Sequence, residues 1–203
     1  MRATLRAVGE TSITAGLILM LFCAYLLWGT GAYTESRQLL LQRELAAKDR
    51  GRLDRIEPGQ ALALLRIPEL GPDYRYAVIE GVGAAQLRKG PGHYPDSAMP
   101  GQVGNFVLSG HRTTYAAPFN ELDELEPDDE IVVEAREARY TYRVTSQDIV
   151  RPDEVDVLAP VPGKPGLRPV RAHITLSTCH PEYSAAERLI VHGVLQRSEP
   201  REE

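Results

Sequence analysis

The sequence has 203 residues, of which 43% are hydrophobic and 25% charged, and its formal net charge is −5 at pH 7. A chain of this length usually forms one domain plus an appendage, because domains cluster near roughly 100 to 150 residues. The negative charge and the scattered arginines exclude a nucleic-acid partner, which requires a concentrated basic patch.

The first predicted element is the uncharged segment 11–34. It is mostly apolar and long enough to cross a ~30 Å hydrocarbon layer at ~1.5 Å per helical residue. Arg2 and Arg6 precede it, and such charges favour the cytoplasmic side of a membrane. We therefore predict a cytoplasmic stub at 1–10, one transmembrane helix at 11–34, and a single-pass plasma-membrane protein whose remaining residues are extracytoplasmic.

A cleaved signal peptide is the alternative interpretation of this segment. Small residues at 29–32 offer a possible cleavage site. The apolar run is longer than the apolar region of a usual signal peptide, and helix-forming residues follow it without a break. These two features favour the uncleaved anchor.

The rest of the chain divides into three predicted parts. Residues 35–59 are rich in helix formers and charge, which predicts a helical stalk or linker. Residues 60–196 form a β domain, and 197–203 form a charged tail. The β domain is indicated by short apolar runs between glycines and prolines: ALALLRI, YAVIEGV, NFVLSG, EIVVEA, YTYRV, VDVL, HITLST and RLIVHGVL.

These runs predict about eight short strands in an all-β, antiparallel barrel or sandwich. Residues 83–90 and 117–125 are each expected to form a short helical connection between strands. The chain has no internal repeat, Walker loop or dinucleotide-binding fingerprint, so we predict no cofactor.

The two cysteines cannot plausibly pair, because Cys23 lies in the predicted membrane helix and Cys179 in the outer domain. A free thiol outside the cytoplasm is a hazard unless it is buried, paired between chains, or used as a nucleophile. Only about 3% of an unperturbed thiol is ionised at neutral pH, so a nucleophile also requires a base or positive neighbours.

An arginine and a histidine are candidates for those neighbours. HITLSTC reads as a strand that ends with the thiol on its polar face, and an antiparallel return would bring Arg188 beside Cys179. Arginine stays protonated and can stabilise an oxyanion. Among five histidines, His111 has the best context, because it follows a buried-looking strand and a glycine at a strand end. His180 adjoins the cysteine but should point to the opposite side.

The acidic run at 121–130 could gather calcium, since carboxylates suit hard cations. Its spacing differs from that of an EF-hand, which requires a central glycine and a glutamate at position twelve. We therefore expect a solvated acidic loop and no metal site, with calcium dependence as the alternative.

Three separated segments resemble the sortases, membrane-anchored cysteine transpeptidases of Gram-positive bacteria. TLSTC at 175–179 is similar to the family's TLxTC motif, with Arg188 at the usual distance, and NFVLSGHRTTY is similar to its histidine-bearing segment. The wider pattern around both segments is most similar to class E sortases of actinobacteria. The resemblance implies an eight-stranded sortase-type β-barrel with Cys179 as nucleophile, His111 as general acid and base, and Arg188 as stabiliser of the tetrahedral intermediate.

The resemblance also implies a reaction. Sortases cleave a C-terminal sorting signal of a secreted protein between Thr and Gly, hold the protein as a thioacyl enzyme, and pass it to an amine. A class E member is expected to prefer Leu-Ala-x-Thr-Gly, with Tyr115 lining the groove, and to use a peptidoglycan precursor as the amine. We also predict substrate contacts for Thr178 and Ser109.

Two other functions compete with this prediction. Peptidoglycan L,D-transpeptidases also use Cys, His and Arg, but their histidine lies close before the cysteine, whereas His111 lies 68 residues upstream of Cys179. The second alternative is a non-catalytic, anchored β-domain that binds the cell wall, in which Cys179 would be incidental.

The predicted anchor can be tested by fractionation. A C-terminally tagged protein should remain with the membranes at full length, because an uncleaved apolar helix holds it there. Release of a shortened, soluble form would instead identify the segment as a signal peptide.

Overall fold

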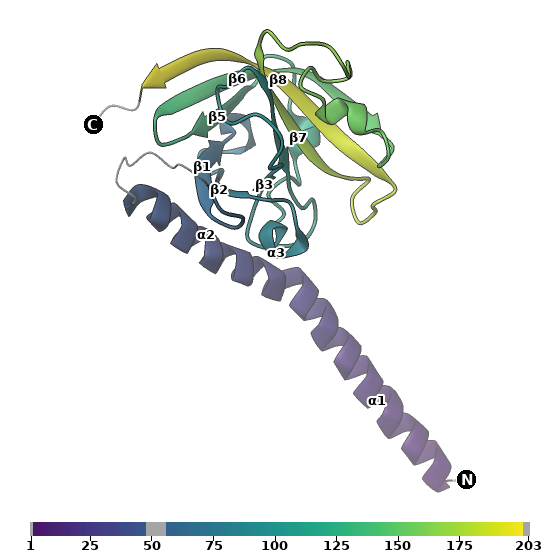
Figure 1. Ribbon diagram of the computed structural model, residues 1–203. Coiled ribbons are helices and arrows are strands. Elements are labelled where there is room, and N and C mark those ends of the chain that lie inside the picture. Colours follow the sequence, from purple (N-terminus) through teal and green to yellow (C-terminus); the bar gives the residue numbers. More distant parts are fainter. Residues whose placement is uncertain (1, 48–55, 201–203) are drawn as a thin grey trace.

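The computed structural model describes residues 2–47 and 56–200. The N-terminal helix α1 spans Arg2–Ala24 and continues through a π-helical turn, Tyr25–Gly29, into α2, Thr30–Ala47. Helix α1 projects away from the rest of the chain, whereas α2 lies along one side of the barrel (Figure 1). By length and composition α1 could cross a membrane, a test that an N-terminal signal sequence would also pass.

Within the described residues, eight strands form a closed barrel in the order β1-β2-β3-β4-β7-β8-β6-β5. The strands are β1 Ala61–Arg66, β2 Arg75–Glu80, β3 Gly92–His93, β4 Gly104–Ser109, β5 Glu130–Glu134, β6 Ala138–Val150, β7 Ala172–His180 and β8 Glu187–Pro200. The predicted eight-stranded barrel is confirmed, and the sandwich alternative is excluded.

The barrel closes around one main apolar core. Alternate side chains of the strands point inward, so Phe106 and Leu108 of β4 meet Ile174 and Leu176 of β7, all fully buried. Burial at roughly 25 cal/mol per Å² of apolar surface makes this packing the main stabilising contribution.

The structure differs from the predicted strands in three ways. VDVL forms the 3-10 helix η4, Val155–Leu158, because prolines at 160 and 162 follow it and cannot donate to a strand ladder. Strand β3 was missed, since a two-residue strand within GPGHYP has no apolar run to reveal it. The barrel is also mixed, because β2–β3 and β4–β7 are parallel pairs.

Each of the two predicted helical connections contains a short helix. Helix α3, Ala84–Leu87, lies in the first connection, and the 3-10 helix η3, Leu122–Glu124, lies in the second. A further 3-10 turn, η2, spans Pro68–Leu70.

The predicted stalk is α2 as far as Ala47, and its residues 48–55 lie outside the described residues. Residues 197–200 of the predicted tail belong to β8, and 201–203 lie outside the described residues.

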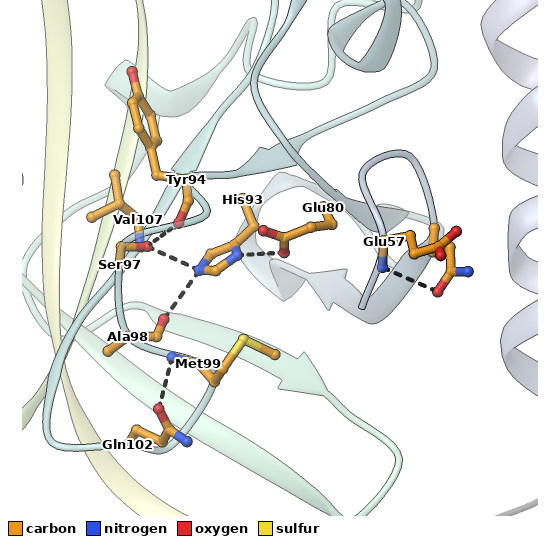
Figure 2. Close-up of polar contacts among 10 residues, drawn as sticks. Glu57, Glu80, His93, Tyr94, Ser97, Ala98, Met99, Gln102 and Val107 are labelled. Atoms are coloured by element: carbon orange, nitrogen blue, oxygen red, sulfur yellow. Dashed lines mark hydrogen bonds and ion pairs between the residues drawn. The ribbon is translucent and has the colours of Figure 1, made fainter. Parts of the chain in front are cut away.

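The seam between β2 and β3 is short. Only Ile79 with Gly92 and Glu80 with His93 pair across it. The buried His93 ring lies 2.7 Å by Nδ1 from Glu80 Oε2, and its Nε2 lies 2.9 Å from Ser97 Oγ (Figure 2). These contacts of His93 supplement the seam and also fix the turn that follows β3.

Candidate active site

The register of β4, β7 and β8 brings the three predicted catalytic residues to one end of the barrel. Strand β4 runs parallel to β7 with Ser109 opposite Ser177, and β7 runs antiparallel to β8 with Cys179 opposite Arg188. Beyond β4, Gly110 N–H donates to the Ser177 carbonyl at 3.1 Å. His111 is the next residue along the chain. It therefore lies at the end of the barrel where β7 carries Cys179.

The thiol of Cys179 is free and half-buried at the end of β7. Thr178, next to it, is buried and its hydroxyl donates to the Gly110 carbonyl at 2.9 Å. This bond ties the strand that carries the thiol to the backbone just before His111. The hydroxyl proton is thus engaged within the fold, and a substrate contact for Thr178, like that for the half-buried Ser109, stays a prediction.

Arg188 is half-buried and turned toward the β7–β8 loop. Its guanidinium donates to the carbonyls of Ala185 at 3.1 Å and Glu187 at 2.8 Å. It also lines a small hollow of about 60 Å³ with Ser177 and Tyr94. Both bonds come from Nη1, so the Nε and Nη2 donors remain for an oxyanion on a group attached to Cys179.

His111 lies in a partly desolvated position beside an aromatic ring. Burial lowers its pKa below the ordinary value, and the positive charge of Arg88 lowers it further. The ring centroids of His111 and Tyr115 are 5.0 Å apart, and the guanidinium carbon of Arg88 lies 5.7 Å from the Tyr115 centroid. Near neutral pH the imidazole is therefore mostly neutral, the form that can accept a proton.

Tyr115 is held in an unusual backbone conformation. Tyr115, Ala116 and Ala117 have φ values of 54°, 60° and 42°, a region that side chains other than glycine rarely adopt. The loop is closed by the Phe119 N–H, which donates to the His111 carbonyl at 3.1 Å. The loop thus presents Tyr115 to His111, while its predicted substrate contact stays a prediction.

Arg112 is a site residue that the sequence analysis missed. Its guanidinium is almost fully buried, 3.0 Å by Nη1 from His180 Nδ1 and 2.8 Å by Nη2 from Asp123 Oδ2. Since arginine can only donate, His180 accepts through Nδ1 and is neutral in this contact. Arg112 thus joins the loop after His111 to the strand end after Cys179. An arginine in a loop is ordinarily exposed, so the sequence carries no signal for this role.

His192 joins a chain of hydrogen bonds on the outer face of the barrel. His192 Nδ1 lies 2.9 Å from Thr175 Oγ1, which donates to Asn105 Oδ1 at 2.8 Å. The Asn105 amide then donates to the carbonyl of Ala159 at 3.0 Å. Desolvation lowers the pKa of both His192 and His173. This relay fastens the β6–β7 loop to the outer face of β4 and β7.

A groove extends from the Arg188 hollow along that outer face. Tyr94 and Leu158 line both the hollow and a larger pocket of about 520 Å³. The larger pocket also includes Asn105 and Val107 of β4. An extended chain could therefore lie between the β3–β4 and β6–β7 loops and end near Arg188.

Among the described residues, no group of three or more His, Cys, Asp or Glu side chains could hold a metal ion. Within the acidic run, Asp123 pairs with Arg112, and Glu130 pairs with Arg143 at 2.9 Å. The absence of a metal requirement stays a prediction, with calcium dependence as its alternative.

The contribution of Arg88 to His111 can be measured directly. In Arg88→Met the loss of a positive charge should raise the pKa of His111 toward its ordinary value, while desolvation still holds it below. Titration of the labelled His111 ring by NMR would record the change. Lys89→Met removes the neighbouring charge and should leave the titration unchanged. An unshifted titration in Arg88→Met would show that Arg88 does not act on His111.

The comparisons with known proteins agree with this geometry. A sortase-domain model matches residues 65–196. Sortase SrtE1 of Streptomyces coelicolor is 38% identical over 208 residues, which cover 97% of this chain but only 58% of that protein. A structure of Streptomyces coelicolor sortase E1 with a tripeptide in its active site aligns with TM-score 0.65 and 40% identity, covering 72% of this chain and 94% of that chain.

A second solved structure extends the likeness to another genus. SrtF sortase from Corynebacterium diphtheriae aligns with TM-score 0.70 and 32% identity over 76% of this chain and 94% of that chain. Because the family model covers most of the barrel and the class E relative aligns with nearly the whole chain, this protein belongs to the sortase family, whose members are cysteine transpeptidases.

Proposed function

We propose that this protein is a membrane-anchored, class E-like sortase. It cleaves a Leu-Ala-x-Thr-Gly sorting signal between Thr and Gly and joins the new C-terminus to a cell-wall amine. The observation that carries the proposal is the pairing of Cys179 with Arg188 in adjacent strands, with His111 at the same end of the neighbouring parallel strand. The family match gives no support to the L,D-transpeptidase interpretation.

In the first half of the proposed reaction, neutral His111 takes the proton of the Cys179 thiol, and the resulting thiolate attacks the carbonyl carbon of the threonine. The π electrons move onto the carbonyl oxygen, and Arg188 donates hydrogen bonds to this oxyanion. When the oxyanion collapses, the C–N bond to glycine breaks, and protonated His111 gives its proton to the leaving amine. The products are a thioacyl enzyme and a free glycine amine.

In the second half, an acceptor amine attacks the thioester carbon. Neutral His111 accepts the proton that the amine loses, and the C–S bond breaks to release the Cys179 thiolate. The lowered pKa of His111 suits this step, because it keeps the imidazole able to accept a proton near neutral pH. Burial and the charge of Arg88 both favour that neutral form.

The proposed partners follow from the location of the site. If α1 is the anchor, the barrel stands beside the outer membrane face, where secreted proteins with sorting signals and lipid-linked wall precursors are both present. The proposal therefore includes an N-terminus in the cytoplasm, a peptidoglycan precursor that carries the acceptor amine, and no cofactor.

The nucleophile can be tested with the full-length protein in detergent. Wild-type protein and Cys23→Ala should cleave a Leu-Ala-x-Thr-Gly peptide and transfer it to an added amine, because the outer thiol remains. Cys179→Ala should lose all activity, since it removes the attacking sulfur. Mass spectrometry should detect the thioacyl adduct on Cys179 alone. Full transfer by Cys179→Ala would leave a non-catalytic role for this thiol.

Arg188 should act on the transition state. Arg188→Ala should lower kcat by ~10² to 10³, the usual effect of deleting one oxyanion donor. Arg139→Ala changes an exposed arginine on β6 and serves as the control. Steady-state kinetics of both variants would decide the matter, and wild-type turnover in Arg188→Ala would remove Arg188 from the mechanism.

A further inference from the structure

Helix α2 completes the hydrogen bonding of β2 where β3 does not reach. The Gln38 side-chain amide donates to the Ala77 carbonyl at 3.0 Å, and its oxygen accepts the Ala77 N–H at 2.7 Å. Gln38 and Ala77 are both buried. The side chain thus substitutes for a strand residue, and its removal would leave two buried backbone groups without partners, which is costly in a region without water.

The same helix holds the segment that leads from α3 to β3. Thr34 is fully buried, and its hydroxyl donates to the Arg88 carbonyl at 2.8 Å. The Gln38 amide also donates to the Lys89 carbonyl at 2.8 Å. Gly90 allows this approach, because a Cβ there would come within 2.1 Å of Gln38 Nε2. Two consecutive backbone carbonyls are therefore fixed by α2.

The fixed segment is connected to His111 through the side chains of Arg88 and Tyr115. Arg88 places its guanidinium over the Tyr115 ring, which lies against the imidazole of His111. Closer to α1, the Thr30 hydroxyl lies 3.5 Å from the Tyr115 backbone nitrogen. The helix therefore contacts both the loop of His111 and the backbone of Arg88.

We propose that α2 is part of the catalytic unit and that Thr34 and Gln38 are positioning residues, which act on His111 by holding Arg88 over Tyr115. The proposal rests on the proposed function for the role of His111. It also makes the anchor and the site one unit, because α2 continues from α1. Thr30 and Thr34 fall within the segment 11–34 that the sequence predicts to be transmembrane, yet both contact the barrel domain. In this proposal the membrane-spanning part therefore ends before Thr30, and the His111 loop would stand close to the membrane surface.

The experiment uses the full-length protein in detergent or in a lipid nanodisc. Thr34→Val and Gln38→Leu remove the hydrogen bonds at nearly constant volume. In both variants the pKa of His111, followed by NMR, should rise, because Arg88 is no longer held in place. The kcat for peptide transfer should fall by on the order of 10-fold to 100-fold, the scale of a small misplacement of a catalytic group.

A matched control is available one turn further along α2. Gln42→Leu is the same substitution, and the Gln42 amide reaches Gln38 and Arg75 only at 3.4 and 3.5 Å, so its titration should match the wild type. In an Arg88→Met background, Gln38→Leu should add no further change to the pKa of His111, because the proposed intermediary is absent. An additional shift there would contradict the proposed route.

The outcomes separate this proposal from the proposed function. If the wild type transfers no peptide, the proposed function fails, while the His111 titrations still test the positioning by α2. If Gln38→Leu does not fold, Thr34→Val, which removes one hydroxyl group, decides the question. Unchanged His111 titration in folded Thr34→Val, or in both variants, would overturn the proposal.

Discussion

The site depends on the register of three adjacent strands, β4, β7 and β8. The parallel pairing of β4 with β7 and the antiparallel pairing of β7 with β8 place three chemically different side chains at one end of the barrel. Side chains alternate between the two faces of a strand, so a slip of one residue in either pairing would turn Cys179 or Arg188 away. The buried apolar residues of β4 and β7 fix that register, because a slip would also expose them.

Contacts beyond the strands hold the ends of this arrangement. The Thr178 hydroxyl and the Arg112 guanidinium both join the His111 segment to the end of β7. Each contact lies in a region of low exposure, where a hydrogen bond is stronger and an unpaired group is more costly than in water. The order of the site therefore comes from the polar groups that surround the reacting residues as well as from those residues themselves.

Charge is distributed unevenly around the proposed reaction centre. Arg88 and burial both favour neutral His111, whereas Arg188 donates to two loop carbonyls through Nη1 and keeps its Nε and Nη2 donors. A guanidinium donor binds an oxyanion more strongly than the neutral carbonyl of the bound substrate, because the oxyanion carries full charge. This difference would stabilise the tetrahedral intermediate more than the ground state, as catalysis requires.

The sequence by itself determined the features that depend on local order. The hydropathy of α1 and the alternation of β7 can be read from neighbouring residues, and the short loop between β7 and β8 made the pairing of Cys179 with Arg188 predictable. The strand-end context favoured His111 among the five histidines, and the sortase motifs supported that choice, because family resemblance supplies a distant relationship that periodicity cannot.

Only the tertiary structure decided which distant segments meet. Strand β3 consists of two residues without an apolar pattern, and VDVL has a strand-like composition but is followed by prolines that prevent pairing. The contacts of Arg112 with His180 and of Gln38 with Ala77 join residues 68 and 39 positions apart. A sequence pattern records the preference of each segment for a conformation and a face. Which buried donor meets which acceptor is set by the closure of the barrel, because only the packed core brings those groups within hydrogen-bonding distance.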